Sequence, residues 1–248
     1  MNRLAIIDWG IGGVSIYKLI REKVGDVPTT YVSDTGVTPY GKMSRRELVA
    51  RLDVVIEFLK SRGVTHIVIG CNAASTAIPF LKNHGLSLEG VIEPAVAMTA
   101  KLKPAKLGLI GGRRTVVSGV YRRALAELGI DVRQRIAQPL SGLIENGDIS
   151  SKTLQTQAKQ ILTPIKNSSH ILLACTHYPA IVNVLRHYVS TRTRFIDPAS
   201  EMVKIVERWN LVNLGDDEFL TSGDVAAMKR AAKTAFGVKI ERAVKIKL

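Results

Sequence analysis

The segment HIVIGCN, residues 66–72, is an apolar run that closes on a glycine, a cysteine and an asparagine. A second segment, HILLACT, residues 170–176, has the same pattern, and its Cys175 lies 104 residues after Cys71. Short aliphatic runs bounded by glycine or polar residues are typical of buried strands. The repeat therefore predicts two structural units of one kind. In each, a cysteine closes a strand and opens a segment able to begin a helix.

The region before each of these segments is repeated as well. Ile6-Ile7-Asp8, followed by a glycine-rich turn, resembles Leu109-Ile110-Gly111-Gly112 with an offset of 103 residues. Apolar runs predict strands at 4–7, 29–32, 66–69, 107–110, 132–137 and 171–173, alternating with helical patterns. Strands that alternate with helices form parallel sheets covered on both faces, so we expect an α/β fold.

Two short segments indicate where a helix begins and where the chain passes between the halves. Ser44 and Glu47 have the spacing of a capping box, which predicts that a helix over residues 44–60 begins there. No Pro- or Ser-rich linker divides the halves, and Lys103-Pro104-Ala105 is the plausible crossing between them.

Length and composition limit the class of protein. The chain has 248 residues, which predicts one to two domains, and 46% of them are hydrophobic, enough for a sizeable core. Two cysteines are too few for a disulfide scaffold or for a zinc site built mainly from thiolates. The early apolar run 4–7 is too short for a secretory signal, and no apolar window is long enough for a membrane span. We expect a cytoplasmic globular protein that does not contact a membrane.

The charge is strongly basic. Lys and Arg number 35 against 21 acidic residues, a formal charge of +14. Such a balance suits an anionic small substrate or a nucleic acid. Seven basic residues follow Met228, but no aromatic residue follows Phe236 to stack on bases. A solvated basic face is therefore favoured over a nucleic-acid site.

Two cysteines at equivalent strand ends favour a shared site. A single such cysteine is more often a small buried hydrophobe. Ligands of open α/β sheets bind beyond the carboxyl ends of the strands, so two facing halves would place both thiols in one cleft. The spacing is not CxxC, which weakens a redox interpretation, and a metal would need more ligands than His177 supplies. Acid–base catalysis by the two thiols agrees better with the polar residues near them in the sequence pattern, Asp8, Glu145 and His177. A thiolate and a thiol on opposite faces of one carbon can remove and return a proton with inversion.

Four motifs carry a resemblance that covers nearly the whole chain. The chain resembles the cofactor-independent glutamate racemases of the aspartate/glutamate racemase superfamily. The matching segments are 8–13 (DWGIGG), 33–41 (SDTGVTPYG), 71–75 (CNAAS) and 174–179 (ACTHYP), with weaker matches at 92–94, 143–147, 196–198 and 221–224.

The resemblance implies a complete set of site residues. Cys71 and Cys175 would be the two catalytic acid/bases, with Asp8 assisting the first and Glu145 and His177 assisting the second. The substrate pocket would be lined by Trp9, Pro39, Tyr40, Gly41, Asn72, Ala73, Thr115 and Thr176. No metal or cofactor is implied. The implied reaction interconverts L- and D-glutamate, a small anionic amino acid, and supplies D-glutamate for peptidoglycan.

The resemblance also implies an architecture. Two similar three-layer α/β domains with mainly parallel sheets would be related by a pseudo-twofold, with the active site in the cleft between them. The first domain would comprise residues 1–97 plus 207–248, and the second residues 98–206. A homodimer is expected.

Three positions depart from the family pattern. Trp9 stands where the family has Ser, Ala73 where it has Thr, and Gly112 where Thr is usual. Each change removes a hydroxyl, and a lost contact to a charged group costs on the order of 1.5–3 kcal/mol. This leaves two alternatives open: a racemase or epimerase of a different or larger amino acid, and a basic, non-catalytic binding protein on the same fold.

Overall fold

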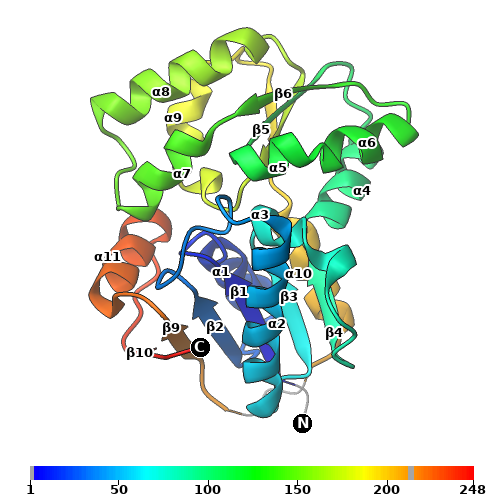
Figure 1. Cartoon of the computed structure of the whole chain (residues 1–248). Helices are drawn as coiled ribbons and strands as arrows, with labels where there is room; N and C mark the ends of the chain where they lie inside the picture. The colour runs from blue at the N-terminus through cyan, green and yellow to red at the C-terminus, as the bar shows by residue number, and fades with distance from the viewer. Residues whose placement is uncertain (1–2, 212–214) are drawn as a thin grey trace.

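Two parallel β-sheets, each covered by helices, form the two halves of the protein (Figure 1). The structure is a computed structural model that describes residues 3–211 and 215–248. The first sheet has the strand order β10-β9-β2-β1-β3-β4 and the second the order β6-β5-β7-β8. Every pair of neighbouring strands is parallel, which confirms the predicted α/β class.

The strands of the two sheets show the internal repeat directly. Those of the first sheet are β1 (Leu4–Asp8), β2 (Thr29–Ser33), β3 (His66–Ile69), β4 (Ser87–Gly90), β9 (Glu218–Thr221) and β10 (Ala243–Lys245). Those of the second are β5 (Leu107–Gly111), β6 (Val132–Ile136), β7 (His170–Ala174) and β8 (Arg194–Ile196). The order β2-β1-β3-β4 in one half matches the order β6-β5-β7-β8 in the other.

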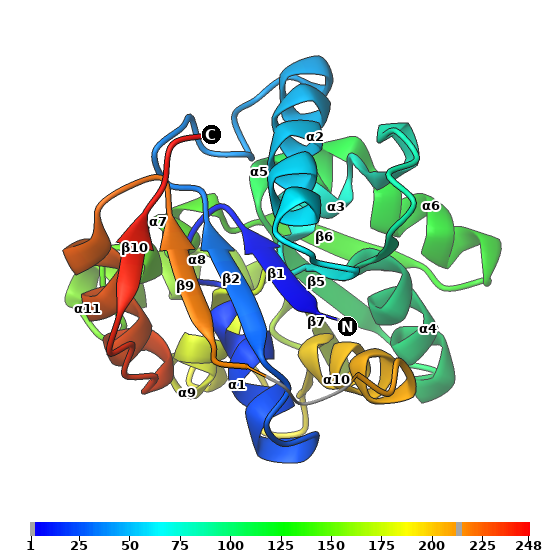
Figure 2. The same ribbon diagram turned by 90° about the horizontal axis from the view of Figure 1, so that it is seen from below.

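The helices lie on both faces of each sheet (Figures 1 and 2). They are α1 (Val14–Lys23), α2 (Arg45–Ser61), α3 (Asn72–Ser75), α4 (Ile92–Leu102), α5 (Arg113–Ser118), α6 (Val120–Glu127), α7 (Gln138–Glu145), α8 (Lys152–Leu162), α9 (Val182–Arg186), α10 (Ala199–Arg208) and α11 (Val225–Phe236). Short 3-10 turns lie at Ile78–Phe80, Thr163–Ile165 and Tyr178–Ile181. The predicted capping box is present, because Ser44 and Glu47 cap each other at the start of α2.

Two helices connect the halves. The predicted domain boundaries, 97/98 and 206/207, fall inside α4 and α10, which contact each other, and α10 also packs on α1 of the first half. Lys103 ends α4 in the left-handed conformation, with φ of 44°, and the chain then enters β5. The exact domain limits stay a prediction.

The C-terminal segment forms the edge of the first sheet. Residues 239–248 belong to the basic C-terminal stretch, and β10 pairs with β9 there (Figure 2). Two of its basic side chains have partners within the C-terminal region: Lys239 forms an ion pair with Glu241, and Lys229 donates to the Glu241 carbonyl. Among the described residues, no helix is both long enough and apolar enough to span a bilayer.

Candidate active site

A cavity of about 290 Å³ lies between the two halves. Its lining includes residues at the carboxyl ends of four strands: Asp8 ends β1, Cys71 follows β3, Gly112 follows β5 and Cys175 follows β7. The carboxyl ends of the two central strand pairs therefore converge on one space, as the repeat predicted. Both cysteines are free thiols.

The Cys71 side of the cavity contains one carboxyl group. Asp8 is buried, and its two oxygens accept hydrogen bonds from the backbone N–H groups of Trp9 and Gly13, each at 2.6 Å. Burial raises the pKa of the Asp8 carboxyl. Burial and then the charge of Asp8 raise the pKa of the Cys71 thiol well above its ordinary value. Cys71 is therefore held as a neutral thiol.

The Cys175 side has a different polar environment. His177 Nδ1 lies 3.6 Å from Cys175 Sγ, and His177 Nε2 lies 2.6 Å from Glu145 Oε2. Burial lowers the pKa of His177, but the charges and hydrogen bonds of Cys175 and Glu145 outweigh it, and the net pKa is well above the ordinary value. The imidazole is therefore held as an imidazolium beside the sulfur of Cys175.

The glycine-rich turn after β1 allows the second half to approach. A Cβ at Gly10 would collide with the carboxylate of Glu145, and a Cβ at Gly12 would collide with Thr176, His177 and Asp8. Glu145 Oε2 also accepts a hydrogen bond from Ile11 N at 3.0 Å. The turn therefore brings acid–base groups of both halves into contact.

The other expected pocket residues also reach the cavity. Of the thirteen predicted site residues, twelve line it, namely Asp8, Trp9, Pro39, Tyr40, Gly41, Cys71, Asn72, Ala73, Thr115, Cys175, Thr176 and His177. Glu145 lies behind His177 instead. Asn72 Oδ1 accepts from Tyr121 at 2.6 Å, while its buried Nδ2 has no hydrogen-bond partner among the described residues. Since Asn72 lines the cavity, this unpartnered amide donor lies near the space that a ligand would occupy.

Comparison with known proteins shows the family of this chain. The family described as Asp/Glu/hydantoin racemase matches residues 4–206. The chain belongs to this family. A glutamate racemase of Carboxydothermus hydrogenoformans is 30% identical over 99% of this chain and 96% of its own length.

Solved racemase structures share the whole fold. The glutamate racemase isoform RacE1 of Bacillus anthracis superposes with a TM-score of 0.88 at 25% identity, covering 100% of this chain and 98% of that one. The glutamate racemase of Aquifex pyrophilus gives a TM-score of 0.81 at 27% identity, covering 98% of each chain. The chain is thus a racemase, an isomerase, with two α/β domains. The individual roles of its site residues stay predictions.

Four lining residues of this racemase were not singled out from the sequence: Lys42, Gln138, Ser141 and Gly142. Gln138 begins α7 just beyond β6, and the carboxyl end of a parallel strand is the signal that could have found it. Its Oε1 accepts from Arg113 N at 3.1 Å and lies 3.1 Å from where a Cβ of Gly112 would be. The amide of Gln138 therefore takes the space that a Thr at position 112 would need.

Trp9 closes one wall of the racemase cavity. Its indole Nε1 donates to Val37 O at 3.1 Å, so the ring ties the turn after β1 to the loop after β2. The hydrogen-bonding group of Trp9 is therefore engaged within the protein, which favours a packing role over recognition of a substrate.

A buried carboxylate holds the loop that carries Tyr40. Asp34 accepts from Tyr40 at 2.7 Å, from Ser222 at 2.6 Å and from Arg51 through two nitrogens at 2.6 and 2.8 Å. Arg51 also donates to Leu248 O at 3.0 Å. The loop is thus bound to α2 and to the C-terminal segment.

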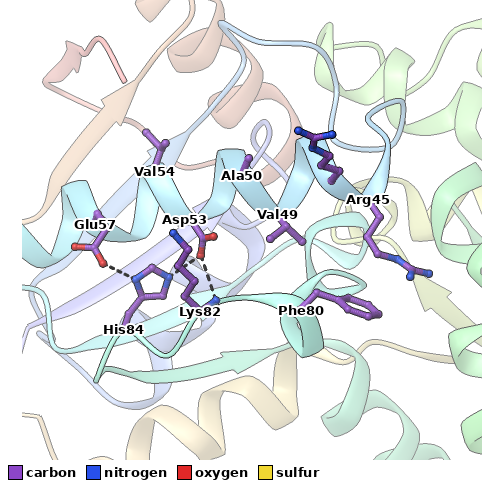
Figure 3. Close-up of a pocket in the computed structure, with 10 residues that line it drawn as sticks. Arg45, Val49, Ala50, Asp53, Val54, Glu57, Phe80, Lys82 and His84 are labelled. Atoms are coloured by element: carbon purple, nitrogen blue, oxygen red, sulfur yellow. Dashed lines mark hydrogen bonds and ion pairs between the residues drawn. The ribbon is translucent and has the colours of Figure 1, made fainter.

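A larger hollow lies on the outer face of the racemase, along α2 (Figure 3). It measures about 890 Å³, and Figure 3 shows His84 bound between Asp53 and Glu57, at 2.7 and 2.6 Å. Neither cysteine lines it. No group of three or more His, Cys, Asp and Glu side chains is arranged for a metal ion within residues 3–211 and 215–248.

Proposed function

We propose that the chain is a glutamate racemase that moves the Cα proton between Cys71 and Cys175 without a cofactor. The observation that carries this proposal is the placement of two thiols on one small cavity in opposite electrostatic settings. Cys71 lies beside a carboxyl group and stays neutral, whereas Cys175 lies beside an imidazolium.

The two settings support a two-base reaction. The Cys175 thiolate removes the Cα proton and leaves the bonding electron pair on Cα, delocalised into the α-carboxylate. The neutral Cys71 thiol then delivers its proton to the opposite face, which inverts the centre. The product complex has the two sulfur charges exchanged, so the opposite enantiomer reacts by the reverse path.

The size and polarity of the cavity favour glutamate over a larger substrate. Its volume of about 290 Å³ lies at the lower end of ligand pockets, which run from roughly 300 Å³ upward. The free Nδ2 of Asn72 and the hydroxyls of Thr115 and Thr176 are donors for carboxylate oxygens, and Lys42 adds a positive charge at the wall. The relatives from Carboxydothermus hydrogenoformans, Bacillus anthracis and Aquifex pyrophilus are glutamate racemases, which supports the same substrate.

The chemistry suggests where the enzyme works. Free thiols persist in a reducing compartment, so we place the reaction in the cytoplasm. D-glutamate for peptidoglycan is the product implied by the family resemblance.

Exchange of the α-proton tests the function. In deuterated buffer, each glutamate enantiomer should acquire deuterium at Cα as it racemises. Cys71→Ala and Cys175→Ala should each abolish racemisation, while aspartate and neutral amino acids serve as substrate controls. Full activity in either variant would overturn the two-base assignment, and exchange only with another amino acid would replace glutamate.

We also propose that two copies of the chain pair through the outer face of α2. Exposed apolar residues lie there, Val54 at 47% and Phe80 at 49%. Arg46 and Glu57 lie near opposite ends of the hollow, about 16 Å apart along the helix axis. Antiparallel docking of two α2 helices would place each Arg46 beside the Glu57 of the other copy, which makes the face self-complementary.

Light scattering of the purified chain tests this pairing. Val54→Arg should convert the dimer to a monomer. Val244→Arg, a similarly exposed valine at 43% on β10, is the matched control and should leave the dimer intact. A monomeric parent chain, or a dimer that survives Val54→Arg, would refute the α2 face.

A further inference from the structure

A second cavity, of about 320 Å³, adjoins the catalytic cavity. Gly41 lines both cavities, and Arg113 of the second cavity directly follows Gly112 of the catalytic one. Its walls come from both halves of the protein: Arg45 begins α2, and Arg113 and Arg114 begin α5. We call this space the arginine vestibule.

The vestibule concentrates positive charge without a counter-charge. No acidic residue lines it, and none of its three arginines forms an ion pair within the described part of the chain. Arg114 donates to neutral oxygens only, Thr76 Oγ1 at 2.9 Å and Met43 O at 2.6 Å. Arg45 lies over the ring of Phe80, 4.3 Å from its centroid.

This arrangement is unfavourable without an anion. Burial and the nearby charge of Arg45 lower the pKa of Arg114. Elsewhere in this protein, the half-buried Arg51 is neutralised by the bidentate carboxylate of Asp34. A bound anion would do the same for the vestibule, because guanidinium groups bind carboxylate and phosphate oxygens strongly.

We propose that Arg45, Arg113 and Arg114 form an anion-capture site that holds a carboxylate of the substrate before it reaches the two thiols. The location supports this order of events, since Gly41 is shared by the two cavities and the arginines therefore lie next to the catalytic one. Clefts lined by one sign of charge concentrate ligands of the other sign and accelerate their association by about 10-fold or more at low salt. The identity of the anion as glutamate rests on the proposed function, but the affinity for anions does not.

Binding of inorganic phosphate tests the site without activity. At constant ionic strength, calorimetric titration of the parent chain with phosphate should give saturable binding that Arg113→Glu abolishes and Arg113→Gln weakens. Arg113 is exposed, and its contact to Gln138 is made by the backbone, so both variants should fold. Arg192→Glu, with the same charge change just before β8 at the other end of the second sheet, should bind phosphate like the parent. Equal binding by Arg113→Glu and Arg192→Glu would overturn the site.

Kinetics then test capture of the substrate. At low ionic strength, Arg113→Glu should lower kcat/KM for glutamate about 10-fold through KM, and added NaCl should reduce the difference. A fall in kcat with unchanged KM, or no difference from Arg192→Glu, would refute capture. If the parent chain racemises no glutamate but phosphate binding depends on Arg113, the proposed substrate fails and the anion site stands.

Discussion

His177 Nε2 lies 2.6 Å from Glu145 Oε2, and this contact adds to the interactions with Cys175 that raise the pKa of His177. The Cys71 side has no equivalent imidazole among its lining residues, and Asp8 lies there instead. The two thiols therefore lie beside different partners before any substrate binds, a carboxyl group at Cys71 and an imidazolium at Cys175.

Removing the charge of Glu145 should slow the reaction while leaving the fold intact. Glu145→Gln loses a charge-assisted hydrogen bond worth about 1.5–3 kcal/mol, which corresponds to roughly a 10- to 100-fold lower kcat. Glu145→Asp should recover part of this loss. Because Glu145 acts through His177, the variant should also move the alkaline limb of the pH–rate profile, and an unchanged profile would argue for a purely structural role.

Asp8→Asn should reduce kcat/KM equally in both directions. The two enantiomers have equal free energies, so the equilibrium constant of racemisation is one, and kcat/KM for L- and D-glutamate must fall by the same factor. We expect about 100-fold or more, as for loss of an acid–base group. The check is circular dichroism of both directions, and α-proton exchange without inversion should persist for the enantiomer whose Cα–H faces Cys175.

Gly12→Ala should destabilise the protein and abolish activity. The added Cβ would meet Thr176, His177 and Asp8 at the junction of the two halves. Gly142→Ala is the contrasting variant, because its Cβ would meet no described atom within 4 Å and its position lies inside α7. Alanine is favoured over glycine in a helix by about 0.8–1 kcal/mol, so thermal unfolding should occur earlier in the first variant and later in the second.

The pair Gly112 and Gln138 should show strong coupling. Gly112→Thr alone forces the Gln138 amide to move, since Oε1 lies 3.1 Å from the new Cβ, and KM for glutamate should rise. Gln138→Ala alone removes a donor and acceptor from the cavity wall and should also raise KM. In the double variant the Thr side chain fits, so the two changes should be less harmful together than their sum. Additive effects would show that Gln138 does not substitute for the missing hydroxyl.

Stability should decline on the alkaline side of neutrality. The raised pKa of His177 means that its contribution is fully present below its ordinary value, about 6.5, and is lost as the pH rises through the raised value. The raised pKa of Cys71 acts in the same sense, because the buried thiol resists ionisation. Urea midpoints measured from about pH 6 to about pH 10 should fall, and less steeply in His177→Asn.

The internal repeat and the motifs that contain the two cysteines could be predicted from the sequence because both are local patterns of residues. The six predicted strands are all present, and Cys71 and Cys175 do share one cavity. The strands β4 (Ser87–Gly90), β8 (Arg194–Ile196) and β9 (Glu218–Thr221) escaped prediction because each contains a charged residue and none has an aliphatic run like that of β3. Gln138 and the arginine vestibule escaped for another reason: their neighbours come from distant segments, which only the fold brings together.

The matching strand order of the two sheets allows the two halves to be compared position by position. The repeat aligns Asp8 with Gly111, each the last residue of its strand, and aligns Ala73 with His177. Each half therefore carries a polar side chain, Asp8 or His177, where the matching position of the other half has none. Under the proposed mechanism one half donates the proton that the other accepts, so neither half alone would hold a complete acid–base set.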